Sequence, residues 1–198
     1  MEKLRAVPAP VPAGSPWDEW GRLTRILESA RLAFDRERSL WASLGIERAK
    51  QVRISAPEGH YNVALHGHIE AVDDAETLLH GSVLVHSYAL AECAAADRLA
   101  TDPRSLGGIE DWGARLLNAN DRDWTDVDGG LGGAVEVAVA RNAFAHGSRT
   151  IDAAARTRLF AAGAHIRPAG SAVTLTYAEL REFRGRLQSL LNSSGIGR

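Results

Sequence analysis

Residues 131–149 read LGGAVEVAVARNAFAHGSR, and this pattern predicts a helix of about four turns that ends at Gly147. One face of the helix is apolar at the spacing i, i+4, i+7, and its members are Leu131, Val135 and Ala138. The same face continues into Asn142 and His146, and Arg141 is the neighbour of Asn142 in sequence. An arginine, an amide and an imidazole near the end of an apolar helix make this stretch the chain's strongest candidate for chemistry.

The rest of the chain has the spacing of helices separated by turn residues. The other expected helices span 17–44, about 73–100, 108–119, 152–162 and 177–191. The first of them follows Ser15 and Pro16 and carries Asp18 three residues after the serine, which is a helix-capping pattern. Six helices with little sheet predict an all-α bundle.

The stretch 46–72 is less regular than the helices around it. Residues 51–55 alternate like a strand, and residues 61–69 are compatible either with a second strand of a hairpin or with a long connection. Asp73 or Asp74 is expected to cap the next helix, with Glu76 in its first turn. That helix is apolar nearly all round, which predicts a central position with His86 and Cys93 in the core.

Length and composition limit the classes of protein that fit. The chain has 198 residues, enough for one domain over 17–192, with an extended arm at 1–16 and a frayed tail at 193–198. A net charge of -2 provides no overall attraction for nucleic acid, so RNA binding would need local positive charge. One cysteine excludes an internal disulfide framework and fits a cytoplasmic protein. The N-terminus has no signal-peptide pattern, and no apolar run is long enough to span a membrane.

Local positive charge is present around the predicted helix end. Residues 141–158 contain four arginines against one acid, and Arg149 and Arg156 are candidates for substrate binding. A guanidinium suits phosphate oxygens, and a histidine can move the proton of the RNA 2′-hydroxyl, so Arg141 and His146 suffice for RNA cleavage without a metal. The two residues are about 140° apart around an ideal helix, so they need an unwound turn, a long reach or a second chain to meet. The alternative is a buried Asn142–His146 pair at a helix end, with the arginines as surface charges.

The motif Arg141-Asn142-Ala-Phe-Ala-His146 resembles the signature of the HEPN superfamily, an arginine followed by a polar residue and then by a histidine four to six residues after the arginine. Gly147 and the nearby Ile151-Asp152 resemble the context of that signature. The segment 86–92, HSYALAE, resembles the helix that packs against the motif helix in ribonuclease-like HEPN families. The resemblance extends over about residues 17–192, and only the six-residue motif is specific.

This resemblance implies a helical bundle that dimerises, with the motif helices of two chains forming one cleft. It implies a metal-independent endoribonuclease that leaves 2′,3′-cyclic phosphate ends, in a toxin–antitoxin, phage-defence or RNA-processing system. His146 would act on the 2′-hydroxyl or the leaving oxygen, Arg141 would stabilise the phosphorane, and Asn142 would orient His146 or the phosphate. The alternative within the same family is a catalytically silent module that dimerises or binds a partner, such as a nucleotidyltransferase antitoxin.

Other residues give weaker signals. Glu92 is expected to be buried and to need a partner on the motif helix, so it is a candidate supporting residue. His66, His68 and Glu70 would share one face of a strand and form a possible metal site, although polar loop residues explain them equally well. The expected site therefore uses no metal and no cofactor.

Overall fold

The structure is a computed structural model that describes residues 15–44, 53–56, 59–62, 65–165 and 168–197, with side chains at 15–44, 59, 71–165 and 168–197. The predicted N-terminal arm, 1–16, lies almost entirely outside these residues. The α-helices of the described part are α1 (Pro16–Ser43), α3 (Leu65–Arg98), α4 (Ile109–Asn118), α5 (Gly130–Ala145), α6 (Ala153–Ala161) and α7 (Tyr177–Ser193). The all-α bundle predicted from the sequence is therefore confirmed.

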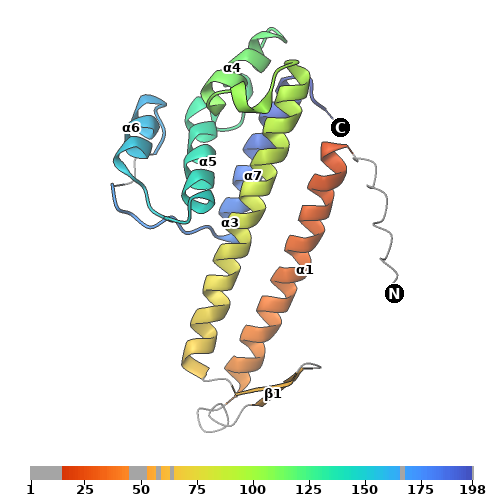
Figure 1. The fold of residues 1–198 in the computed structure, drawn as a ribbon, viewed down its shortest axis with the longest axis vertical. Helices are drawn as coiled ribbons and strands as arrows, with labels where there is room; N and C mark the ends of the chain where they lie inside the picture. Colours follow the sequence, from red (N-terminus) through yellow and green to blue (C-terminus); the bar gives the residue numbers. More distant parts are fainter. Residues whose placement is uncertain (1–14, 45–52, 57–58, 63–64, 166–167, 198) are drawn as a thin grey trace, which may run out of the picture.

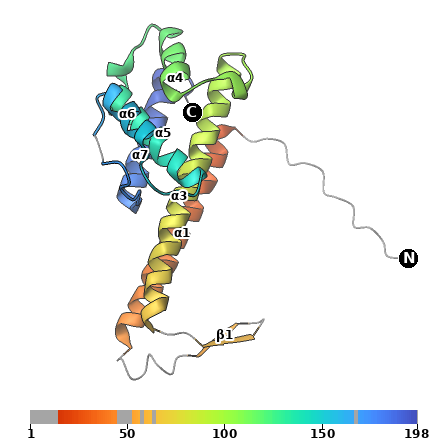
Figure 2. The same cartoon turned by 60° about the vertical axis from the view of Figure 1, so that its left-hand side comes forward.

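Helices α1 and α3 form a long antiparallel pair on which the other helices are arranged (Figure 1). The start of α1 is fixed by the predicted capping box, because the Ser15 hydroxyl accepts from the Asp18 N–H and the Asp18 carboxylate accepts from the Ser15 N–H. The face of α1 that turns toward α3 and α7 buries Trp20, Leu23, Leu27 and Trp41. This pair is the longest part of the molecule and reaches well past the ends of α5 and α7 (Figure 2).

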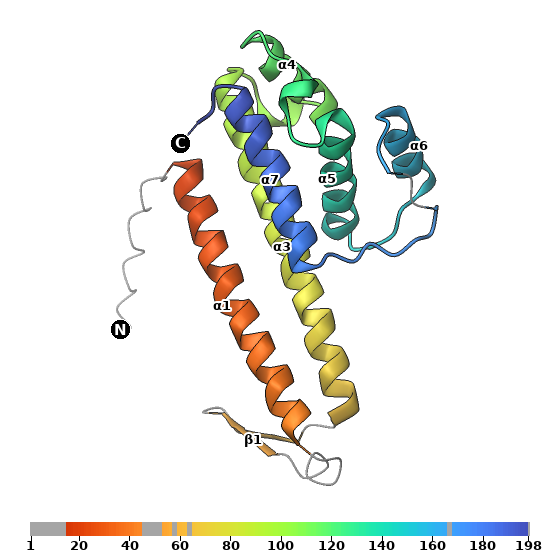
Figure 3. The same cartoon turned by 180° about the vertical axis from the view of Figure 1, so that it is seen from behind.

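Helices α5 and α7 pack against the upper half of α3, and α7 lies on α3 when the molecule is seen from behind (Figure 3). Short 3-10 turns, η1 (Pro103–Ser105) and η2 (Trp124–Asp126), connect α3, α4 and α5. The buried Arg184 of α7 donates to the Trp20 carbonyl at 3.0 Å and to the Thr24 hydroxyl at 3.0 Å. Burial lowers the pKa of Arg184 to about 10, and the guanidinium ties α7 to α1.

The connection between α1 and α3 differs in part from the prediction. Strand β1 (Arg53–Ala56) pairs antiparallel with β2 (Gly59–Asn62) and forms the hairpin that was one of two open alternatives. The second strand does not extend to residue 69, because α3 begins at Leu65 rather than at Asp73 or Asp74. These aspartates lie inside the helix and are not caps. Asp73 pairs with Arg38 at 2.8 Å, and Asp74 pairs with Arg149 at 2.7 Å.

Two further expectations are corrected by burial. His86 and Cys93 are exposed rather than in the core, because they lie on a face of α3 that no described helix covers. The C-terminal residues do not extend freely into solvent: Ser194 is fully buried, Ile196 packs against the core, and the Trp17 indole donates to the Gly197 carbonyl at 3.0 Å. Among the described residues, no helix combines the length and apolar character that crossing a membrane requires.

Candidate active site at the end of helix α5

Helix α5 places the motif through a buried middle and a defined end. Its central residues Val135, Val137 and Ala138 are buried in the core, so the helix has little freedom to rotate. His146 is the C-cap residue, and its N–H donates to the Asn142 carbonyl at 3.0 Å. Gly147 then adopts a positive φ of 70°, which glycine tolerates and which ends the helix where the sequence predicted.

A close helix crossing holds this end of α5 against α3. The ring of Phe144 lies directly over Gly81, where the Cβ of any other residue would come within 2.2 Å of the ring. A side chain at position 81 would therefore push Phe144 away. The crossing sets the depth of the α5 end on α3 and therefore the position of the motif relative to Glu92 and Tyr88.

Arg141 is held by groups of α3 and by its own neighbour. Its guanidinium donates to the Asn142 Oδ1 at 2.9 Å and to a Glu92 carboxylate oxygen at 3.4 Å. It also lies over the Tyr88 ring, 5.0 Å from the centroid. The Arg141 Nε is buried and has no partner among the described residues. The expected partner of Glu92 on the motif helix is thus Arg141, although Glu92 is half-buried rather than fully buried.

Burial disfavours negative charge in this cluster. Desolvation raises the pKa of Glu92 above its ordinary value, and the positive charge of Arg141 offsets part of that rise. Burial also raises the pKa of the Tyr88 hydroxyl, with a further contribution from the charge of Glu92. The Glu92 carboxylate is therefore a weakly held counter-charge for Arg141, which leaves the arginine available to an incoming anion.

His146 occupies a different position from Arg141. Its side chain is exposed and lines a hollow between α5 and α6, here called the α5–α6 hollow. The hollow is lined by Val139, Asn142, Ala143, His146, Ser148, Thr150, Asp152, Ala154, Ala155 and Arg158. Asn142 joins the two motif residues, since it lines the hollow and accepts from Arg141. The expected hydrogen bond between the Asn142 and His146 side chains is not made in the described part of the chain, and the amide oxygen serves Arg141 instead.

The arginine that lines the hollow was missed by sequence reasoning. Arg158 of α6 lines the hollow beside His146 and forms a two-point pair with Glu110 of α4, at 2.5 and 2.6 Å. The sequence counted Arg158 only in the local charge, because nothing in it shows which face of α6 turns toward α5. Of the two predicted substrate-binding residues, Arg149 pairs with Asp74 and Arg156 is exposed on α6; neither lines the hollow.

The Arg158–Glu110 pair predicts a pH-dependent stability. The hydrogen bonds from Arg158 lower the pKa of Glu110 below its ordinary 4.5, so the pair's contribution is present above that pH and is lost as the pH falls through the folded-state value. Glu110→Gln is expected to lower the free energy of unfolding at neutral pH by about 1 kcal/mol. The difference from wild type should shrink in urea unfolding below about pH 4. The surface variant Asp97→Asn is the control, and a Glu110→Gln difference that is independent of pH would contradict the assignment.

The alternative metal site at His66, His68 and Glu70 was expected on the assumption that these residues lie on a strand, and this assumption is wrong. Residues 66–70 lie in α3 rather than on a strand, so the strand geometry on which the expected site depends is absent. The side chains of His66, His68 and Glu70 lie outside those described. Among the side chains that are described, no group of three or more His, Cys, Asp or Glu is arranged to hold a metal ion.

The site therefore consists of a histidine and an arginine, Arg158, in an open hollow, the amide of Asn142 beside them, and Arg141, which contacts that amide and is turned toward α3. These groups can bind a phosphate and move a proton. Comparisons of the chain with protein-family models, with curated proteins and with solved structures found no match.

Proposed function

We propose that this protein is a metal-independent endoribonuclease of the HEPN type, acting as a toxin or phage-defence effector in the cytoplasm. One observation carries the proposal: a rigid, buried helix ends in an Arg141-Asn142-x-x-x-His146 motif whose amide contacts the arginine and lines the same open hollow as the histidine. The all-α bundle is the architecture that the resemblance implies. Arg156 and Arg149 are proposed to contact the RNA backbone outside the hollow.

The chemistry follows from the positions of the three side chains. His146 takes the proton of a 2′-hydroxyl, whose oxygen attacks the adjacent phosphorus and displaces the 5′-oxygen of the next nucleotide. The departing 5′-oxygen takes a proton from solvent, so the product ends are a 2′,3′-cyclic phosphate and a 5′-hydroxyl, and no water is consumed in this step. Arg141 stabilises the phosphorane oxygens, where charge-assisted hydrogen bonds are worth most in the transition state.

The face of α3 that no described helix covers supports the proposed homodimer. Leu78, Val85 and Ala89 of α3 and Phe144 and Ala145 of α5 line one shallow depression, here called the α3–α5 face. Leu78 is 48% exposed, so this face offers apolar surface to a partner. Because this face lies next to His146, a two-fold axis through it would bring the motif ends of two chains together.

The decisive experiment is cleavage of RNA by purified protein in the presence of EDTA, with analysis of the product ends. Cleavage that survives chelation and leaves 2′,3′-cyclic phosphates supports the proposal. Cleavage that EDTA abolishes would contradict the metal-free mechanism. Absence of cleavage by a folded dimer, on total RNA and on structured RNAs, would favour the second candidate.

That second candidate is a catalytically silent HEPN-like module that dimerises or binds an antitoxin. The contact of Arg141 with Glu92 favours it, because the carboxylate competes with phosphate for the arginine. The net charge of -2 favours it as well. Growth on expression separates the two: the nuclease should slow growth and His146→Ala should relieve the effect, whereas the silent module should be harmless in both forms.

The proposed interface predicts the effect of one exposed substitution. Leu78→Arg places a charge in the α3–α5 face and is expected to weaken the dimer by roughly tenfold or more, because burial of a leucine contributes about 1.5–3 kcal/mol. Sedimentation equilibrium measures the dissociation constant. The matched control is Leu32→Arg on α1, where the leucine is 71% exposed and lies away from this face. A dimer that Leu78→Arg leaves unchanged, or a monomeric wild type, would contradict the interface.

A further inference from the structure

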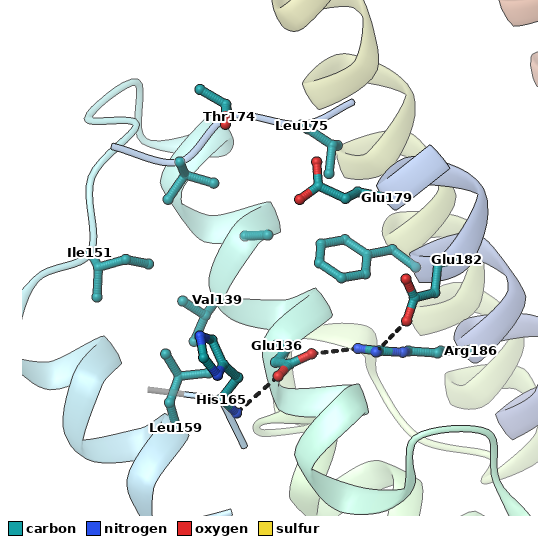
Figure 4. A pocket seen from close by; sticks show the side chains of 13 residues that line it. Glu136, Val139, Ile151, Leu159, His165, Thr174, Leu175, Glu179, Glu182 and Arg186 are labelled. Atoms are coloured by element: carbon teal, nitrogen blue, oxygen red, sulfur yellow. Dashed lines mark hydrogen bonds and ion pairs between the residues drawn. The ribbon is translucent and has the colours of Figure 1, made fainter. Parts of the chain in front are cut away.

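A second cavity lies between α5, α6 and α7, and Figure 4 shows it at close range. Its volume is about 170 Å³. Its apolar wall is formed by Val139, Ile151, Leu159, Val173, Leu175 and Phe183. An engineered apolar cavity of roughly 150 Å³ binds benzene, so this cavity has room for one ring or one short branched hydrocarbon.

The edge of the cavity carries negative charge that is fixed in position. Glu136 of α5 and Glu182 of α7 both pair with Arg186, at 2.5 and 2.6 Å, and Figure 4 shows the three side chains together. Glu136 also accepts from the His165 N–H at 3.0 Å. Glu179 contributes a third carboxylate, which accepts from Thr176 in the cap of α7. Three carboxylates against one guanidinium leave a formal charge of -2 at the edge.

No buried, unpartnered polar atom of the described residues lies in the wall of the cavity to compete with this edge charge, and the other polar side chains of the lining are those of His165 and Thr174. The buried side-chain atoms without a hydrogen-bond partner in the described residues belong to Ser87, Trp112, Arg141 and Arg184, and none of these residues lines the cavity. A ligand therefore gains apolar contact inside and electrostatic attraction only at the edge. The Arg186 and Glu136 side chains are only 16% and 23% exposed, so their charges are less screened than surface charges.

We propose that this cavity binds a small organic cation: an apolar group about the size of a benzene ring enters the pocket, and its ammonium group lies among Glu136, Glu179 and Glu182. This proposal goes beyond the ribonuclease activity and does not depend on it. Val139 of α5 lines both this cavity and the α5–α6 hollow. On α6, Leu159 lines the cavity and its neighbour Arg158 lines the hollow. The ligand therefore binds next to the motif helix without occupying the place of the RNA.

Three compounds of similar shape test the class of ligand: 2-phenylethylamine, 2-phenylethanol and phenylacetate, which are a cation, a neutral molecule and an anion at pH 7. Titrations of the whole protein followed by NMR chemical shifts give the dissociation constants. We expect the amine to bind at least about tenfold more tightly than phenylacetate, with phenylethanol between them. Glu182→Lys brings the formal charge of the edge from -2 to 0 and should abolish the preference for the amine over the acid, since Glu182 is 59% exposed and tolerates the change. Asp97→Lys, a charge reversal elsewhere on the surface, should leave the order unchanged.

A cavity-filling variant and a motif variant complete the test. Val173→Phe should abolish binding of all three compounds; if it fails to fold, the Glu182→Lys comparison decides. His146→Ala should bind the amine as wild type does, so failure of the ribonuclease proposal leaves this result intact. Absence of binding by all three compounds would overturn the site. Equal binding of amine and acid in wild type, or an order that Glu182→Lys leaves unchanged, would overturn the cationic class.

Discussion

Replacing His146 with alanine is expected to lower the rate of RNA cleavage by roughly 10²–10⁴-fold, the usual contribution of a positioned general acid or base. The histidine is suited to this role because its side chain is exposed to the α5–α6 hollow while its backbone is fixed as the C-cap of a buried helix. The loss should appear in the cleavage rate in EDTA, and the product ends that remain should still be 2′,3′-cyclic phosphates.

The control for this variant is His165→Ala, which removes an exposed histidine that lines the cavity between α5, α6 and α7 and not the α5–α6 hollow. It should cleave RNA at the wild-type rate. Urea unfolding should show that His146→Ala is as stable as wild type, because an exposed side chain without a packed partner contributes little to folding. If His146→Ala cleaves RNA at the wild-type rate, the histidine has no part in the mechanism.

Local patterns in the sequence were sufficient to predict the ends of those helices that are capped by neighbouring residues. The capping box of Ser15 and Asp18 and the end of α5 at Gly147 depend on residues close together in the sequence, and the structure has both. The start of α3 was different. The two aspartates that resemble a cap are used for ion pairs with Arg38 and Arg149, which come from distant parts of the chain.

The candidate site shows the same division between local and distant contacts. The motif and the partnership of Arg141 with Glu92 follow from helix periodicity and from the cost of an unpaired buried charge. The role of Arg158 depends on how α6 lies against α5, and the exposure of His86 depends on which face of α3 the described helices leave uncovered. Both depend on contacts between distant segments, so the pattern of a few neighbouring residues could not predict the role of Arg158 or the exposure of His86.

Mixing two inactive variants is expected to restore about a quarter of the wild-type activity, if the site is shared between two chains. Arg141→Ala and His146→Ala should each be inactive alone. In a random mixture about half of the dimers contain one chain of each kind, and one of the two sites in such a dimer combines an intact arginine with an intact histidine. The two proteins must exchange subunits, so they are best unfolded in urea together and refolded before RNA is added.

The structure gives a reason to expect this recovery. Within one chain Arg141 is turned toward Glu92 and Tyr88 on α3, whereas His146 faces the α5–α6 hollow, which Arg141 does not line. A partner's arginine would reach a histidine of this chain across the α3–α5 face without breaking the contacts that hold it. The same mixture made in the Leu78→Arg background should recover less activity at the same protein concentration, since its dimer is weaker. No recovery in the wild-type background, with dimers present, would mean that each chain completes its own site and that Arg141 must leave Glu92 to do so.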